Sequence, residues 1–359
     1  MPGIERNVII DLIKSKHYLP SNQNQLIEDS EIIVIAVPTP LNVNRYPDLK
    51  YLEEASKTIG QYAQAGALVV NESTSYPGTL RNYIKPLVEK IAKVDLQYAA
   101  APERVDPGNE SWNLENTPRV ISGLTEASTK KAVEFYSSFC NQVYQAPSAE
   151  IAEASKLFEN TFRQVNIALS NEFSEIANSL GFSSSEAIKA ASTKPFGFMP
   201  FYPSIGVGGH CIPIDPSYLS YAAELVGAKA QFINLANETN LLSHIKVASR
   251  INAYMGGSLT GIKIQIAGIA YKSNVSDLRE SPALLLIKEL RKLGADISWC
   301  DPLVNEFENT KSKPLDVNID LGLIVTPHEQ IDFSIWKKAN TRVLDLSANS
   351  KNYGWPKFL

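Results

Sequence analysis

Hydrophobic and polar positions follow two alternating periods in the first 147 residues. A β-branched run at 32–37 (IIVIAV) is followed by a stretch at 51–66 with helical spacing that stops at a glycine. The same order repeats through 67–79, 81–94, 96–108 and 118–139. Strands that alternate with helices are typical of a doubly wound parallel sheet, so we expect an α/β domain here.

The pattern changes between residues 148 and 255, where no strand signal occurs. Residues 149–181 predict one long amphipathic helix or a helix pair, and a serine cap opens a further helix at 183–192. A loop at 194–215 separates these from two more helical stretches. We therefore expect a helical central domain.

Strand–helix alternation returns at residue 261. Residues 261–272 predict a strand, and 281–294 predict a helix with Ser281 as N-cap and Pro282 at its first position. Three more strands are predicted at 296–302, 321–331 and 341–347. The expected fold is α/β: two Rossmann-like doubly wound parallel-sheet domains, at 1–147 and 256–359, joined by the helical central domain at 148–255.

Charge and composition argue against several classes of partner and site. The formal net charge is −4 and no basic run occurs, so we expect no nucleic-acid partner. The apolar stretches are strand-sized and no signal peptide opens the chain, so we expect no membrane contact and a cytoplasmic protein. Three widely spaced cysteines argue against a disulfide framework. His210 adjoins Cys211, but neighbouring side chains point apart, and we expect no metal site.

The loop at 206–216 (GVGGHCIPIDP) places Cys211 among glycines. One interpretation is a tight turn around a buried, inert cysteine, with Asp215 before Pro216 as an ordinary helix start. The other is that the glycines let the backbone approach a ligand closely, and that Cys211 precedes a helix N-terminus that favours its thiolate. The loop by itself leaves both interpretations open.

Polar side chains elsewhere in the chain occupy positions suited to chemistry. Lys156 and Asn160 are four residues apart and share one helical face, although an isolated pair of this kind is usually a solvated stripe. Other polar residues follow predicted strands, at the sheet edge where α/β proteins bind ligands. These residues are Ser73, Thr74, Ser75, Glu103 and Arg104.

Six ordered motifs together resemble the UDP-glucose/GDP-mannose dehydrogenase family of nucleotide-sugar 6-dehydrogenases. They are VPTP (37–40), ESTSYPGT (72–79), PERVDPGN (102–109), the K-x-x-x-N helix, the stretch 193–216 and AGIAYKSNVSDLRESPA (267–283). The stretch 193–216 is most similar to members that act on UDP-N-acetylglucosamine.

The resemblance implies an NAD-dependent, four-electron oxidation of a UDP-sugar C6 alcohol to the uronic acid, for polysaccharide biosynthesis. Cys211 is the implied nucleophile, which traps the intermediate aldehyde as a thiohemiacetal and then becomes a thioester. Lys156 and Asn160 match the groups that stabilise the oxyanion, and Asp215 matches a base or water-orienting aspartate. A homodimer or higher homo-oligomer, formed through the helical section, is also implied.

The resemblance assigns the remaining site residues. The catalytic set is Cys211, Lys156, Asn160, Asp215, Glu103 (acid/base) and Thr74 (water-holding). The substrate set is Tyr202, Ser204, Gly206, Gly208, Tyr271, Lys272 and Arg104. The cofactor set is Pro38, Thr39, Ser73, Thr74, Ser75 and Arg279.

The chain also departs from the pattern of the family. No G-x-G-x-x-G turn occurs in the sequence, so we expect that the first βαβ unit of the NAD-binding domain is missing, that the sheet has an exposed edge and that NAD binds weakly. Asp345 is followed by LSANS, where members often carry an arginine. Ahead of the glycine loop, where many members have an arginine, Lys194 is the only cation.

Three alternatives remain at this point. One is a truncated, non-catalytic remnant that binds UDP-sugar through residues 202–208 and Lys272. A second is a cysteine hydrolase or acyltransferase, which needs a histidine placed to deprotonate Cys211. His210 is adjacent in the sequence and poorly placed for this, so His244 or His328 would have to reach the loop. The third keeps the reaction but changes the substrate to UDP-glucose or UDP-N-acetylmannosamine.

Overall fold

The computed structural model describes residues 5–106, 109, 111–209 and 211–359. The chain divides into two compact units, one formed by residues 1–159 and 217–229, the other by 160–216 and 230–359. The division into three domains at 147 and 255 stays a prediction. No helix in the described part of the chain is both long and apolar enough to cross a membrane.

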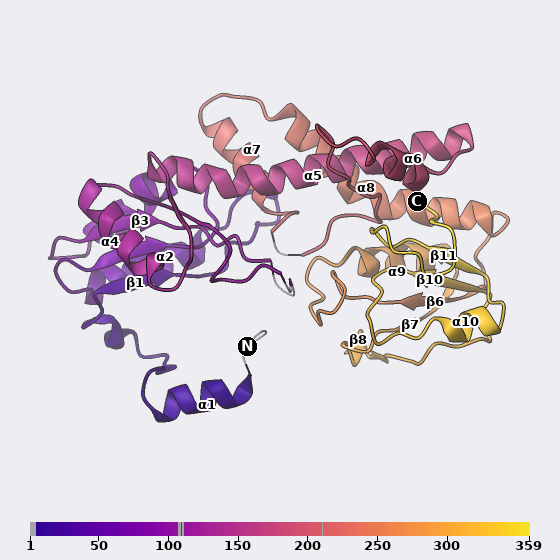
Figure 1. Ribbon diagram of the computed structural model, residues 1–359, viewed down its shortest axis with the longest axis horizontal. Helices are drawn as coiled ribbons and strands as arrows, with labels where there is room; N and C mark the ends of the chain where they lie inside the picture. The colour runs from indigo at the N-terminus through magenta and orange to yellow at the C-terminus, as the bar shows by residue number, and fades with distance from the viewer. Residues whose placement is uncertain (1–4, 107–108, 110, 210) are drawn as a thin grey trace. The chain divides into compact units, whose positions relative to one another are not determined.

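The first unit contains a five-stranded sheet, coloured indigo to magenta in Figure 1. Its strands are β1 (Ile32–Ile35), β2 (Leu68–Asn71), β3 (Gln97–Ala100), β4 (Arg119–Gly123) and β5 (Val143–Gln145), in that spatial order. Its helical segments are α1 (Arg6–Lys14), η1 (Asn24–Ile27), α2 (Lys50–Tyr62), the π-helix η2 (Leu80–Ile84), α3 (Lys85–Glu89) and α4 (Glu126–Ser137). Among the described strands β1 is an edge strand, and Val34 is exposed there.

Successive side chains of β2 enter the two cores of this sheet. Val69 packs with Leu52 of α2 and Val88 of α3 on one face. Leu68 and Val70 pack with residues of α4 on the other. Because side chains alternate across a strand, a strand with helices on both faces is apolar at every position, which is the pattern of residues 67–70.

The pairing of β3 with β4 differs from the expected parallel arrangement. β3 and β4 run antiparallel, whereas β1, β2 and β3 are parallel and β4 and β5 are parallel. The described part of the connection 101–118 contains no helix. A parallel connection needs a crossover, usually a helix, so a chain without one returns in the opposite direction.

The second unit contains a four-stranded parallel sheet in the order β11-β10-β6-β7. These strands are β6 (Lys263–Ala267), β7 (Asp296–Cys300), β10 (Leu321–Ile324) and β11 (Val343–Asp345), and β8 (Glu306–Phe307) pairs with β9 (Thr310–Lys311) in a hairpin. The helices are α6 (Ser184–Ala191), α8 (Gln231–Tyr254), α9 (Pro282–Lys292) and α10 (Ser334–Lys338). α5 (Ala149–Leu180) is one continuous helix and contributes to both units, as does α7 (Asp215–Leu225).

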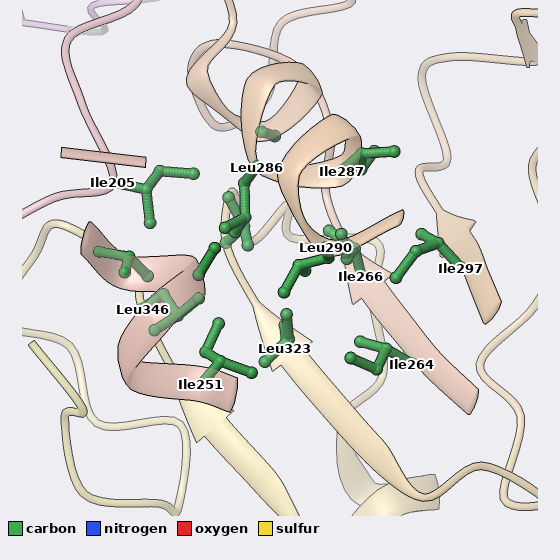
Figure 2. Packing of buried hydrophobic residues seen from close by; sticks show 14 of the residues in the cluster. Ile205, Ile251, Ile264, Ile266, Leu286, Ile287, Leu290, Ile297, Leu323 and Leu346 are labelled. Atoms are coloured by element: carbon green, nitrogen blue, oxygen red, sulfur yellow. The ribbon is translucent and has the colours of Figure 1, made fainter. Parts of the chain in front are cut away.

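The largest core of this unit lies between the sheet and the helices α8 and α9 (Figure 2). Leu286 and Leu290 of α9 and Ile251 of α8 pack over Ile266 and Leu323 of the sheet. Ser281 is the N-cap residue of α9 with Pro282 next, as expected, but its hydroxyl donates to the Ile269 carbonyl oxygen (2.7 Å) rather than capping the helix. That bond ties the helix start to the loop after β6.

Candidate active site

Ser73 joins the loops that follow β1 and β2 in the first unit. Its Oγ accepts a hydrogen bond from the N–H of Val37 (2.8 Å) and donates to the Val37 carbonyl oxygen (2.9 Å). The cofactor-assigned residues of these two loops thus lie at the carboxyl edge of the first unit's sheet. In those loops Thr39, Ser73 and Ser75 are buried, Thr74 is half-buried and Pro38 is exposed.

Glu153 of α5 anchors the loop after β2, and sequence reasoning missed it. Its carboxylate accepts hydrogen bonds from the N–H groups of Gly78 (2.6 Å) and Leu80 (2.9 Å) and from Ser75 Oγ (3.2 Å). Burial raises the pKa of Glu153 to about 7, against these hydrogen bonds, which lower it. The sequence did carry a signal for Glu153: its carboxylate lies on the buried face of the predicted helix, one turn before Lys156.

Arg119 of β4 is the second residue that sequence reasoning missed. This buried guanidinium forms ion pairs with Glu72 and Glu103, and the Tyr136 hydroxyl donates to Glu72. Burial lowers the pKa of Arg119, but the Glu72 and Glu103 carboxylates outweigh it and the net shift is upward. The carboxylate of Glu103, the assigned acid/base residue, is therefore held by the Arg119 guanidinium. Its Oε1 also accepts a hydrogen bond from the N–H of Val105 (2.7 Å).

Arg104 and Lys156 complete the assigned residues of the first unit. Arg104 forms an ion pair with Glu159 (3.1 Å) and donates to the Pro118 carbonyl oxygen (2.7 Å). Lys156 is buried in α5. The guanidinium of Arg104 is thus engaged by protein groups in this structure.

In the second unit, Asn160 and Asp215 are brought together from segments 55 residues apart. The Asn160 amide donates a 2.6 Å hydrogen bond to Asp215 Oδ2, and Asp215 is buried as the first residue of α7. The Asp215 N–H in turn donates to the Cys211 carbonyl oxygen (2.8 Å). Cys211 therefore lies in the turn that starts α7, where the helix dipole favours an anion.

The exposure of Cys211 decides between the two interpretations of its loop. Cys211 is exposed, so the buried, inert cysteine is wrong. The other two thiols have the character expected of structural cysteines: burial raises the pKa of Cys140, and raises that of Cys300 to about 11.

The glycine loop packs closely against the loop after β6. A Cβ on Gly209 would lie 2.9 Å from the ring of Tyr271, and one on Gly208 would lie 2.7 Å from Pro282 and 3.1 Å from Tyr271. Gly206 and Gly209 also have φ angles of +139° and +88°. The glycines are thus needed for packing and conformation, and the substrate-assigned residues Gly206, Gly208 and Tyr271 are adjacent.

The other substrate-assigned positions in this unit lie around that loop. The backbone N–H of Ser204 donates to Asn171 Oδ1 (2.7 Å), and its hydroxyl donates to the Gly206 carbonyl oxygen (2.8 Å). Tyr202 and Lys272 are half-buried. Tyr202 lies two residues before Ser204, and Lys272 directly follows Tyr271.

Arg279 and Asp345, two residues singled out in the sequence, each form an ion pair with another residue of the second unit. Arg279, assigned to the cofactor, is exposed and forms an ion pair with Asp277 (2.6 Å), which raises its pKa. Asp345 forms an ion pair with Lys357 (3.1 Å), so a lysine from the chain's last segment supplies a cation beside this aspartate.

The histidines and acidic groups give no sign of a metal centre. No group of three His, Cys, Asp or Glu side chains in the described ranges is arranged to hold a metal ion. His210 lies outside the described residues. His328 is buried between Asp301 and Asn274, and is thus not available to deprotonate Cys211.

Three family models match the chain in order. The models of the UDP-glucose/GDP-mannose dehydrogenase family match residues 4–140 (NAD binding domain), 150–241 (central domain) and 265–349 (UDP binding domain). The expectation that the N-terminal part of the NAD-binding domain is missing is not supported, because that model matches from residue 4.

Individual relatives agree with the family models. A UDP-N-acetyl-D-glucosamine 6-dehydrogenase from Salmonella typhi is 32% identical over 308 residues, which cover 83% of this chain and 72% of that protein. A UDP-N-acetyl-D-mannosamine dehydrogenase from Pyrococcus horikoshii is 34% identical over 330 residues, which cover 87% and 74%. A solved structure of a UDP-D-ManNAc dehydrogenase from Pyrococcus horikoshii matches at 30% identity with a TM-score of 0.85, covering 99% of this chain and 86% of that one. The chain therefore belongs to the UDP-glucose/GDP-mannose dehydrogenase family, and it is an NAD-dependent nucleotide-sugar dehydrogenase.

Proposed function

We propose that this chain oxidises the C6 alcohol of UDP-N-acetylglucosamine to the uronic acid through a covalent bond to Cys211. The observation that carries the proposal is an exposed thiol in the turn that starts α7, next to the hydrogen-bonded Asn160–Asp215 pair. It is supported by the family's UDP binding domain at 265–349.

Each step of the proposed reaction balances in atoms and electrons. Loss of a proton from the C6 hydroxyl and of a hydride from C6 gives an aldehyde. The Cys211 thiolate then adds to the aldehyde carbon and forms a thiohemiacetal alkoxide, whose loss of a second hydride gives a neutral thioester. Water cleaves the thioester to the carboxylate and the Cys211 thiolate, with release of two protons. NAD, when bound, supplies the oxidant by accepting one hydride in each oxidation.

The remaining assigned residues fit separate parts of this scheme. The Lys156 ammonium and Asn160 amide, one helical turn apart, stabilise negative charge on the C6 oxygen. Asp215 orients or deprotonates the water that cleaves the thioester. Glu103 serves as acid or base and Thr74 holds the water.

The loops at the carboxyl edge of the first unit's sheet fit a dinucleotide. Thr39 and the serines after β2 supply hydroxyl and backbone groups at the edge where parallel sheets bind nucleotides. Asn71, at the end of β2, has a buried Oδ1 without a hydrogen-bond partner among the described residues, and a donor group of the cofactor would satisfy it. Pro38, Thr39, Ser73, Thr74, Ser75 and Arg279 are the proposed cofactor residues.

The sugar nucleotide is proposed to contact the glycine loop and the loop after β6. These contacts are Tyr202, Ser204, Gly206, Gly208, Tyr271 and Lys272, with Arg104 from the first unit. UDP-N-acetylmannosamine is the second candidate substrate, because similar proteins carry that name. The ratio of kcat/KM for UDP-N-acetylglucosamine, UDP-N-acetylmannosamine and UDP-glucose tests the choice; a preference for UDP-glucose would contradict both candidates.

A homodimer through the helices α5 and α8 is part of the proposal. Both helices expose large apolar side chains in the second unit, which is unusual for a surface that stays in water. These are Phe162, Leu169, Ile176 and Leu180 of α5, and Phe232 and Leu235 of α8. Light scattering of the chain and of Leu169→Glu tests this: we expect a dimer that the substitution dissociates.

Two of the earlier alternatives lose their support. The non-catalytic remnant rested on a missing N-terminal part, which the family match from residue 4 does not support. The cysteine hydrolase or acyltransferase does not agree with the dehydrogenase family that all three models match, and His328, one of its two candidate bases beside His244, is buried. A cytoplasmic location and a role in polysaccharide synthesis stay predictions.

The stoichiometry of the reaction tests the proposal as a whole. We expect two NADH for each uronic acid formed, with no aldehyde released. One NADH per sugar with free aldehyde would contradict the covalent route.

A further inference from the structure

Two buried side chains of the UDP binding domain form a pair directly after the ends of two strands. Asp301 follows β7 and His328 follows β10, and the side chains of both have no exposed surface. His328 Nε2 lies 3.0 Å from Asp301 Oδ2. A buried carboxylate needs several donors, so the neighbours of this pair indicate what it holds.

Asp301 holds the beginning of the loop 269–274. Its Oδ2 accepts hydrogen bonds from the backbone N–H groups of Ile269 (2.9 Å) and Ala270 (3.1 Å). Its Oδ1 accepts the N–H of Leu303 (3.0 Å), so both oxygens are used. The beginning of the loop is thus fixed through its backbone, whatever its side chains do.

His328 holds the end of the same loop. The backbone N–H of Asn274 donates to His328 Nδ1 (2.9 Å), so Nδ1 is the acceptor and the hydrogen is on Nε2, which donates to Asp301. Asn274 has a φ of +62°, and its Oδ1 accepts the N–H of Glu329 (3.1 Å). One imidazole therefore joins the end of the loop to the carboxylate that holds its beginning.

The segment between these two anchors carries Tyr271 and Lys272, the side chains proposed to contact the sugar nucleotide. Tyr271 also forms the surface against which Gly208 and Gly209 pack. Movement of the loop would therefore displace both the proposed nucleotide contacts and the glycine loop that leads to Cys211.

We propose that Asp301 and His328 are positioning residues, which hold the loop 269–274 so that Tyr271 and Lys272 are in place for a uridine diphosphate before it binds. This inference rests on the proposed function, because the nucleotide contacts of that loop are part of it. Preorganisation of this kind raises affinity by removing the cost of ordering the loop on binding.

Two substitutions separate the two hydrogen bonds of the imidazole. His328→Asn keeps an acceptor near Nδ1 for Asn274, and His328→Gln keeps a donor near Nε2 for Asp301. Calorimetric titration of the full chain with UDP measures the effect, and His244→Gln, at a half-buried histidine of α8, is the matched control. We expect the dissociation constant of UDP to rise about tenfold in each His328 variant and to stay unchanged in the control.

A positioning role and a merely structural role differ in the kinetics. With UDP-sugar as substrate, we expect KM to rise in the His328 variants while kcat at saturation stays within about twofold of the unchanged chain. A loss of thermal stability with no change in the affinity for UDP would overturn the inference. If the unchanged chain bound no UDP, the proposed function itself would fail.

A measurement on the unchanged chain keeps the inference testable if the variants do not fold. In hydrogen exchange without nucleotide, we expect the amides of Ala270 and Asn274 to be strongly protected. Exchange of these amides at the rate of an exposed loop, with protection appearing only after UDP is added, would overturn the inference.

Discussion

The amide of Asn160 donates a 2.6 Å hydrogen bond to the carboxylate of Asp215, and the N–H of Asp215 donates to the carbonyl oxygen of Cys211. This series of contacts joins α5, the start of α7 and the turn that carries the thiol. The bond from Asn160 fixes one oxygen of the Asp215 carboxylate.

Asp215→Asn tests the proposed role of this carboxylate in the last chemical step. Without a carboxylate to act on water, thioester cleavage slows while both oxidations proceed. We expect a burst of two NADH per active site, followed by steady turnover reduced about 10²–10⁴-fold. Stopped-flow absorbance measures both phases. Asp332→Asn, beside the start of α10, is the control and should turn over normally; a D215N variant with no burst would place Asp215 in an earlier step.

Glu153 predicts a pH dependence of stability. Its pKa is raised by burial from 4.5 to about 7, so between these values the unfolded state loses its proton while the folded state keeps it. The free energy of unfolding therefore falls as pH rises through this window, by about 3 kcal/mol from this group. Urea unfolding of the chain and of Glu153→Gln measures the difference.

Glu150, in the same helix, is the matched control for that experiment. The hydrogen bond from Arg81 lowers the pKa of Glu150 to about 2, so it stays ionised in the folded state. Its stabilising effect is lost only as pH falls below the range in which an unfolded glutamate titrates. The difference in the free energy of unfolding between the unchanged chain and Glu150→Gln should therefore not depend on pH above about pH 5. If the difference for Glu153→Gln did not depend on pH either, the claim that burial raises the pKa of Glu153 would be contradicted.

Arg119 is predicted to be essential for the first unit. Arg119→Met removes the buried cation that pairs with Glu72 and Glu103 and leaves these two half-buried carboxylates without it. We expect a loss of about 2–3 kcal/mol in the free energy of unfolding, because the carboxylates lose charged hydrogen bonds but still reach water. Denaturant unfolding measures it; a loss below about 1 kcal/mol would show that water satisfies both carboxylates.

Local patterns predicted a large part of the fold. Alternation of strands and helices predicted the doubly wound sheets, and the spacing of Lys156 and Asn160 predicted that they share a face of what is one continuous helix. Serine capping at Ser183 is confirmed by its bond to the Glu186 N–H (3.3 Å). These features depend on residues close together in the sequence.

Contacts between distant segments could not be predicted in the same way. Glu153 meets Gly78 across 75 residues, and Asp301 meets His328 across 27. Single residues at such separations carry no periodic signal, and the direction of β4 relative to β3 is not encoded in the alternation either. The sequence therefore does not reveal the contacts between distant segments that hold the loops of the proposed site.

The bond between Cys211 and the oxidised carbon is the central claim, and mass spectrometry of the acid-quenched reaction tests it most directly. With UDP-N-acetylglucosamine, NAD and the D215N variant, the account predicts that the peptide containing Cys211 gains the mass of the UDP-sugar acyl group, and that Cys211→Ser abolishes both this adduct and the acid product. Formation of the uronic acid by the Cys211→Ser variant at the normal rate would contradict it.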